Sequence, residues 1–290
     1  MKTALRVLIS VAVLGAVLWV VQPQAALGAI TRPHPGWLAL AVGALLAQIF
    51  LSALRWRVTA RAMGQTLPLL WAMQEYALSV AANTFLPGGV LGDLGRIFRS
   101  RKMGWQGHGW KGAAASVVIE RLTGQVAMLG LMLLALGLWW GAKGAALICA
   151  TLGLCWGVLR YWPKLRGLLA QAWCGANVWP AQLALTLAIL VANLAGFWAA
   201  AQAVGVGLEM SAALVLIPVT LLAMLLPVSL NGWGLREGVA AALWPLWGIA
   251  APQAVAASIV FGLACMAAAL LSLLPFLPRM RLVKSGQKQH

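Results

Sequence analysis

The chain has 290 residues, of which 62% are hydrophobic and 9% are charged. This excludes a soluble globular protein, in which about a quarter of the residues are charged. The net charge of +16 would suit a nucleic-acid-binding protein. However, the basic residues lie in short loops between apolar segments, the pattern of topology signals and anionic-lipid contacts. We therefore predict an integral membrane protein with no nucleic-acid partner.

Six apolar segments are suited to cross the hydrocarbon core as helices, which takes about 20 residues each. They are 4–22, 36–54, 113–140, 144–159, 180–204 and 252–277. Alternating ten-residue strands are absent, so the fold class is an all-α polytopic bundle. The first segment, which follows Lys2 and Arg6, also fits a signal peptide. We favour an uncleaved helix, because everything that follows is membrane-embedded and the charged start suits a cytoplasmic end.

Two further apolar segments, 66–92 and 211–248, are interrupted by Pro and Gly. If each enters the membrane and returns as a re-entrant hairpin, 17 of the 21 Lys and Arg residues face the cytoplasm and only Arg32 and Lys143 face outside. Arg121 and Arg236 then remain within the membrane. A full crossing by 66–86 would place a basic loop outside. We therefore predict two hairpins, with both termini in the cytoplasm. Their opposite directions suggest an inverted repeat, although the halves share no clear residue-level similarity.

The first hairpin ends in Pro87, Gly88 and Gly89, followed by Asp93 and Arg96. Proline ends a helix, and the glycines permit a sharp reversal. We expect Asp93 to cap a short helix whose first turn contains Arg96. Exposed N–H groups at that helix start, together with the arginine, would form an anion site. The alternative is a tight turn with a capping Asp and an interfacial arginine.

Glu120 and Arg121 are adjacent within the segment 113–140. Neighbouring helix positions point about 100° apart, so the two are poor partners for each other. We expect Glu120 to meet Arg96 or Arg236, and Arg121 to meet Asp93. A charge within the hydrocarbon is costly unless it is paired or borders a water-filled cavity, so by default it marks a functional site. The alternative is a structural ion pair that locks the bundle.

In the second hairpin we expect Ser229 or Asn231 to cap a half-helix, and Trp233 to cover a cavity. Arg236 is the strongest candidate for phosphate binding, because a guanidinium group binds phosphate oxygens in pairs. The alternative is a hairpin held together by an ion pair between Arg236 and Glu237. The predicted substrate-binding residues are Gly88, Gly89, Asp93, Arg96, Glu120, Arg121, Asn231, Arg236 and Glu237.

The three arginines and three carboxylates of these motifs sum to zero charge. An anionic headgroup would therefore displace a carboxylate, or arrive as a carboxylate takes a proton. Secondary polar candidates, expected to be structural, are Gln74, Glu75, Asn83 and Asn193. The stretch 54–58 is expected to lie on the inner membrane surface as a basic amphipathic segment. The four Cys and three His lack metal-ligand spacing, so we predict no metal and no cofactor.

These motifs resemble the lysylphosphatidylglycerol synthase transmembrane-region family, also called flippase-like integral membrane proteins. The resemblance covers about residues 40–275, and its pieces are residues 85–89 with Gly92, Asp93 and Arg96, then Glu120 and Arg121, then Gly232, Gly234, Arg236 and Glu237. It implies about eight membrane elements in a bacterial or archaeal cytoplasmic membrane. In the family's best-known member, a soluble domain aminoacylates the lipid and the membrane part moves it across the bilayer. This sequence shows no such domain, so we expect a stand-alone member.

We therefore expect a protein that is not an enzyme and that translocates an anionic phospholipid or a polyprenyl-phosphate-linked lipid. The headgroup would enter a polar groove between the hairpins while the tails remain in lipid. One alternative is an intramembrane enzyme acting on lipid, which no Ser/His pair or metal-binding acid cluster supports. Another is an accessory that docks a lipid-modifying or glycosyl-transferring enzyme. It would tolerate loss of Arg236 or Glu120 but not changes in the cytoplasmic loops.

Overall fold

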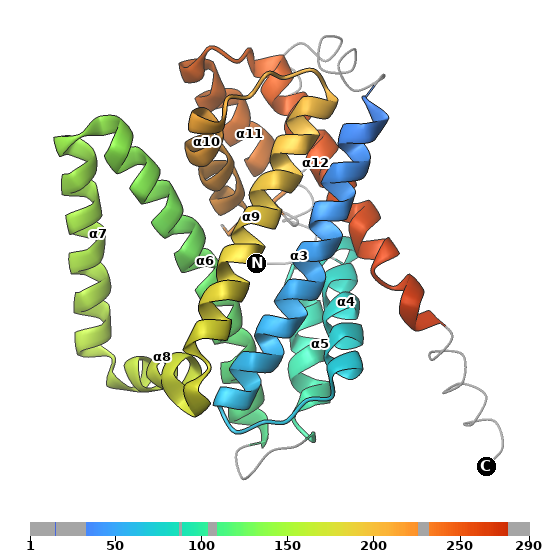
Figure 1. Cartoon of the computed structure of the whole chain (residues 1–290), viewed down its shortest axis with the longest axis vertical. Helices are drawn as coiled ribbons and strands as arrows, with labels where there is room; N and C mark the ends of the chain where they lie inside the picture. The colour runs from blue at the N-terminus through green and yellow to red at the C-terminus, as the bar shows by residue number, and fades with distance from the viewer. Residues whose placement is uncertain (1–14, 16–32, 87–88, 104–108, 226–231, 278–290) are drawn as a thin grey trace.

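The computed structural model describes residues 15, 33–86, 89–103, 109–225 and 232–277 (Figure 1). These residues form ten α-helices and no strand, which confirms the all-α prediction. The long helices are α3 (Pro35–Ala62), α6 (Gly109–Trp140), α7 (Ala142–Tyr161), α9 (Trp179–Ala203) and α12 (Ala251–Leu271). The short helices are α4 (Leu69–Phe85), α5 (Leu91–Ser100), α8 (Pro163–Cys174), α10 (Met210–Leu222) and α11 (Leu235–Leu243).

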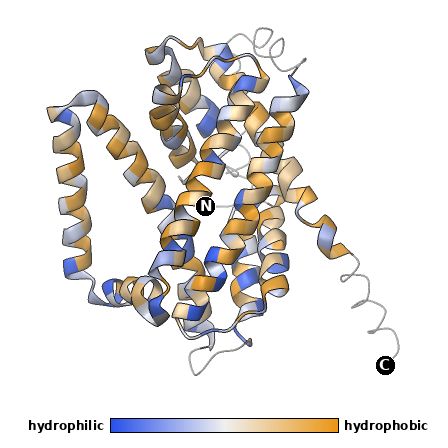
Figure 2. Ribbon diagram, viewed as in Figure 1, coloured by the Kyte–Doolittle hydropathy of each residue, from blue (hydrophilic) through white to orange (hydrophobic). Residues whose placement is uncertain are grey.

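The long helices α3, α6, α7 and α9, and the stretch Ala251–Phe276 that begins with α12, are long and apolar enough to cross a membrane. Figure 2 shows hydrophobic residues along the whole length of these helices. The chain is thus a multi-pass membrane protein. The predicted crossing at 4–22 lies outside the described residues, apart from Gly15. Helix α3 continues well beyond the predicted end at residue 54.

The helices are ordered as two similar halves. In the first half, α3 is followed by the hairpin α4–α5 and then α6; in the second half, α9 is followed by the hairpin α10–α11 and then α12. The first helix of each hairpin packs against the last helix of the other half: α4 against α12, and α10 against α6. Figure 1 shows the two hairpins toward opposite ends of the bundle. This arrangement agrees with the inverted repeat that the broken segments suggested.

The pair formed by α3 and α9 is the centre of the bundle. A Cβ added at Gly196 of α9 would lie 3.0 Å from the Leu45 side chain of α3, so a glycine is needed for this close approach. Small residues at helix interfaces are typical of membrane proteins, where packing rather than hydrophobic burial drives association. Phe197 of α9 stacks on Phe261 of α12, with ring centroids 4.5 Å apart. These contacts hold both halves against one another.

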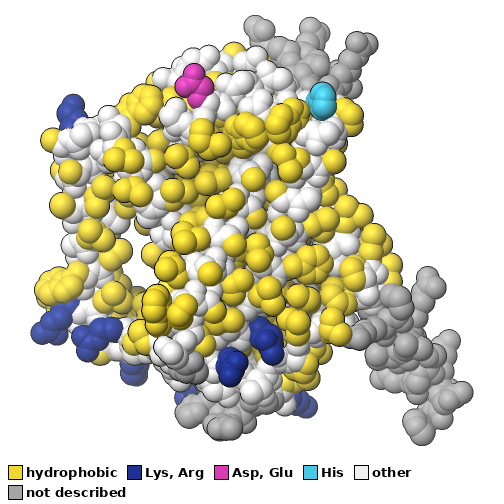
Figure 3. Space-filling model, viewed as in Figure 1, with side chains coloured by type: hydrophobic (Ala, Val, Ile, Leu, Met, Phe, Trp, Pro, Cys, Tyr) yellow, Lys and Arg dark blue, Asp and Glu magenta, His cyan; other side chains and the backbone are white. Residues whose placement is uncertain are grey.

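Helix α7 packs against α6 and α8 and stands apart from the remaining bundle in Figure 1. The stretch between the predicted crossings 144–159 and 180–204 contains the helix α8. Figure 3 shows basic side chains gathered mainly at the end of the molecule where α8 lies, below a broad apolar belt. The exposed basic residues near the C-terminal ends of α3, α5 and α7, near the start of α6 and on α8 are Arg61, Arg99, Lys102, Lys111, Arg160, Lys164 and Arg166. Lys and Arg side chains are thus concentrated at one end of the described bundle.

Candidate functional site

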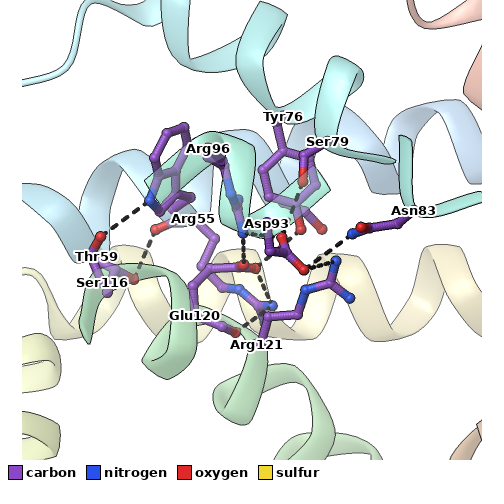
Figure 4. Close-up of polar contacts among 12 residues, drawn as sticks. Arg55, Thr59, Tyr76, Ser79, Asn83, Asp93, Arg96, Ser116, Glu120 and Arg121 are labelled. Carbon is purple, nitrogen blue, oxygen red and sulfur yellow. Dashed lines mark hydrogen bonds and ion pairs between the residues drawn. The ribbon is translucent and has the colours of Figure 1, made fainter. Parts of the chain in front are cut away.

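Buried charged side chains gather in two places. The first cluster consists of Arg55 on α3, Asp93 and Arg96 on α5, and Glu120 and Arg121 on α6 (Figure 4). The second cluster consists of Arg236 and Glu237, both near the start of α11. Each cluster therefore includes the second helix of a hairpin.

Glu120 is the centre of the first cluster, with only 1% of the residue exposed. Its Oε1 accepts a hydrogen bond from Arg55 Nη2 at 2.8 Å, and its Oε2 lies 3.4 Å from Arg96 Nη2. The Tyr76 hydroxyl also donates to Oε1, at 3.3 Å. The predicted pairing with Arg96 is confirmed. The alternative partner, Arg236, belongs to the second cluster instead.

Asp93 is not the cap that the sequence suggested. Val90 occupies the N-cap position and Asp93 is the third residue of α5. There its negative charge still interacts favourably with the positive end of the helix dipole. The carboxylate accepts hydrogen bonds from Ser79 and Asn83 of α4, both at 3.1 Å. The side-chain oxygen of Asn83 accepts the backbone N–H of Gly92 at 2.7 Å. Helix α4 thus supplies the capping group of α5.

Two glycines shape this hairpin. Gly89 has φ of +64°, so it adopts the left-handed conformation that the predicted reversal needs. A Cβ added at Gly92 would lie only 2.0 Å from the Ser79 carbonyl oxygen, so α5 can lie against α4 only with glycine there. The predicted site residues Gly88 and Asn231, and the predicted cap Ser229, lie outside the described residues.

Arg96 is fully buried and bridges two carboxylates, with Nη2 2.9 Å from Asp93 Oδ1 and within reach of Glu120. Its guanidinium group lies between two rings, 4.6 Å from the centroid of Trp56 and 4.5 Å from that of Tyr76. Cation–π contacts of this kind hold a desolvated guanidinium firmly. At the start of α5, where an anion site was expected, the N–H of Gly92 is already bonded to Asn83 and Arg96 is enclosed by these rings.

The predicted pairing of Arg121 with Asp93 is confirmed, since Arg121 Nη2 lies 2.6 Å from Asp93 Oδ2. Unlike Arg96, it keeps 41% of its side-chain surface exposed. Arg55 was not predicted to belong to a site at all, because the stretch 54–58 was assigned to the membrane surface. It is only 3% exposed, since α3 continues past it to Ala62 and packs against α6 and α9.

Arg55 changes the charge of the cluster. Three guanidinium groups face two carboxylates, so the first cluster carries one positive charge in excess, and the neutrality expected from the motifs does not hold there. Several donors also lack a hydrogen-bond acceptor within the described part of the chain: Nε and Nη1 of Arg55, Nε and Nη1 of Arg96, and Nε of Arg121. Buried polar groups are normally paired, so this set is suited to receive an anion.

The first cluster opens onto a cavity of about 220 Å³ between α3, α6, α9 and the end of α10, which we call the first cavity. Its polar lining consists of Gln48, Ser52, Arg55, Tyr76, Glu120, Arg121, Gln125, Thr186 and Asn193. The Thr186 hydroxyl has no hydrogen-bond partner among the described residues. A Cβ added at Gly124 would lie 2.9 Å from Arg55 Nη2, so this glycine makes room for the guanidinium group.

In the second cluster, Arg236 and Glu237 form an ion pair although they are adjacent in the chain. This is the pairing named above as the alternative to phosphate binding by Arg236. Arg236 Nη2 lies 2.6 Å from Glu237 Oε1, and Ser258 of α12 bridges the pair at 2.9 Å from both partners. Glu237 Oε2 accepts the N–H of Gly234 at 2.7 Å and so caps its own helix. This cluster is neutral, and the bonds of Arg236 to Glu237 and Ser258 use its Nε and Nη2.

Arg236 borders another cavity, of about 150 Å³, which we call the second cavity. Trp233 also lines it, as predicted, and its ring lies 5.1 Å from the Arg236 guanidinium carbon. A Cβ added at Gly262 of α12 would lie 2.4 Å from Arg236 Nη2. A glycine on a long helix thus makes room for a buried arginine here, as Gly124 does in the first half.

The secondary candidates have separate positions. Glu75 pairs with Arg99 at the basic end of the hairpin, Asn83 is structural as expected, and Asn193 lines the first cavity. Gln74 is half-buried on α4. Within the described ranges, no three His, Cys, Asp or Glu side chains are placed to hold a metal ion.

A family model described as the lysylphosphatidylglycerol synthase TM region matches residues 4–272. The chain belongs to this family. No curated protein and no solved structure matches it. The resemblance carried by the three motifs is thereby confirmed over nearly the whole chain, and the family indicates a role related to membrane lipids.

Proposed function

We propose that the protein translocates a lipid with an anionic headgroup across the membrane without chemically altering it. The headgroup belongs to a phospholipid or to a polyprenyl-phosphate-linked lipid. The observation that carries this proposal is the excess positive charge of the first cluster beside a cavity, with guanidinium donors that lack acceptors. The family's relation to membrane lipids supports the same class of ligand.

An unpaired charge in the first cluster has an energetic cost that a bound anion would offset. A charge at membrane depth is expensive by roughly 3 kcal/mol or more, and an uncompensated guanidinium group bears that cost in the empty protein. A phosphate group entering the first cavity would supply the missing negative charge and accept hydrogen bonds from Arg55 and Arg121. The lipid tails would remain in the bilayer, because the apolar surface of the bundle faces it.

The positive-inside rule supports one orientation. The end of the molecule with α8 would face the cytoplasm of a bacterial cell, with both chain termini on that side. The hairpin α4–α5 would then enter the membrane from the cytoplasm and α10–α11 from outside, both as re-entrant segments. Hairpins that enter from opposite faces and meet near the midplane are typical of transporter binding sites.

The test is headgroup movement in liposomes that contain the purified protein and fluorescent phosphatidylglycerol or a labelled polyprenyl phosphate. We expect the wild-type protein to move one of these lipids and Arg121→Gln to abolish the movement. The matched control, Arg166→Gln, removes an exposed arginine of α8 and should leave the rate unchanged. Folded wild-type protein that moves none of these lipids would refute translocation and favour an accessory that docks a lipid-modifying enzyme.

A further inference from the structure

Gln48 of α3 lines both cavities. It belongs to a polar stripe on this helix formed by Gln48, Ser52, Arg55 and Thr59. Their spacings of four, three and four residues place them on one helix face. Ser52 and Thr59 are each only 1% exposed. A polar stripe through the centre of an apolar helix is costly unless it lines a path for polar groups or is fully paired.

Part of the stripe extends from the first cluster to the lining of the second cavity. The Gln48 side-chain amide donates a hydrogen bond to the Ser52 hydroxyl at 3.0 Å, and Ser52 lies one turn from Arg55. On its other side, Gln48 faces the cavity that contains Arg236, together with Thr84 of α4. Gln48 is therefore shared by the lining of a cavity built mainly by the first half and that of a cavity built mainly by the second.

We propose that a phosphate headgroup passes between the two cavities along this face of α3, and that Gln48 is the residue that transfers it. This inference rests on the proposed translocation and specifies its route. A neutral amide is suited to the task, because it can donate a hydrogen bond to a phosphate oxygen without holding the anion as an arginine would. Rotation of the Gln48 side chain away from Ser52 would join the two cavities.

Arg236 receives the headgroup at the far end of this route. The pairing with Glu237 and Ser258 fixes its Nε and Nη2, which leaves Nη1 to contact a phosphate oxygen. Because the second cluster is neutral, it attracts an anion less strongly than the first cluster, which carries excess positive charge. The headgroup can therefore leave the second cavity more easily.

The experiment compares movement and binding of phosphatidylglycerol for Gln48→Leu, Gln48→Asn and the wild-type protein. Leu has a similar size but no donor, and we expect movement to fall about ten-fold, the equivalent of one hydrogen bond lost at the barrier. Gln48→Asn keeps the amide with a shorter reach and should give an intermediate rate. Binding of short-chain phosphatidylglycerol, measured by native mass spectrometry, should stay close to wild type, since Arg55 and Arg121 remain.

The matched control is Gln202→Leu, which removes a half-buried amide of α9 that lines neither cavity and should leave movement unchanged. Wild-type movement that Arg121→Gln abolishes but both Gln48 variants retain would refute the route while leaving translocation intact. Equal losses of binding and movement in Gln48→Leu would also refute it, because Gln48 would then be part of the binding site alone. Absence of wild-type movement would refute the proposed function and the route with it.

Discussion

Replacement of Glu120 by Gln tests whether the first cluster is held together by charge balance. Glu120 is the shared partner of Arg55 and Arg96, and it is almost completely buried. Glutamine has the same shape but no charge, so packing against Tyr76 is retained. Three guanidinium groups would then face the single carboxylate of Asp93, and the excess positive charge would rise from one to two.

Removing one partner of a buried ion pair costs about 3–5 kcal/mol, because the remaining charge is left uncompensated. Each kcal/mol shifts the melting temperature of a chain of this size by roughly 2–4 °C. We therefore expect Glu120→Gln to lower Tm by about 10 °C in nanodiscs of phosphatidylcholine. An anionic lipid that occupies the first cavity would compensate the added charge. Phosphatidylglycerol nanodiscs should therefore restore more of the lost stability in the variant than they add to the wild-type protein.

The control is Glu209→Gln, which removes the exposed acidic residue that precedes α10 and should change Tm by less than about 2 °C, as surface substitutions usually do. A Glu120→Gln protein with wild-type Tm would refute the electrostatic account of the cluster. A lowered Tm that responds to phosphatidylglycerol no more than the wild type does would refute the assignment of the cavity to an anion.

Three further substitutions test the packing and the periphery of the clusters. Gly262→Ala places a methyl group against the buried Arg236 guanidinium and should cost about 1–3 kcal/mol by overpacking, whereas Gly130→Ala, with open space around it, should not lower Tm. Gly92→Ala drives a methyl group into the backbone of α4, so we expect little folded protein by size-exclusion chromatography. Glu75→Gln breaks a pair whose arginine is 44% exposed, so Tm should fall by less than the equivalent of about 1 kcal/mol, with lipid movement unchanged.

Composition and segment length were sufficient to predict the all-α membrane fold, because each crossing needs a long apolar run. The three motifs also predicted the contacts of Arg121 with Asp93 and of Glu120 with Arg96. Arg55 was missed because its neighbours Trp56 and Arg57 resemble a basic interfacial segment. Helical periodicity was the available signal, since polar residues recur on one face of α3 from Gln48 onward.

The cap of α5 and the bonding of Arg236 depend on contacts between helices, which sequence patterns could not resolve. Asp93 was expected to cap α5, but Asn83 of the preceding helix performs that role, and only the packing of α4 against α5 reveals it. Arg236 was ranked first for phosphate binding on chemistry alone. The structure shows two of its nitrogens bound by Glu237 and Ser258, and residue 258 lies too far along the chain for a local pattern to indicate the contact.

The two halves of the bundle are alike in architecture but not in charge. In each half, a glycine on a long helix makes room for a buried arginine, Gly124 for Arg55 and Gly262 for Arg236. However, only the first cluster has excess positive charge, because Arg236 of the second cluster is paired with the carboxylate of Glu237. Under the proposed function, such unequal sites would bind an anion more tightly in the first cavity than in the second. The difference in charge between the two clusters has its origin in one residue, Arg55 of α3.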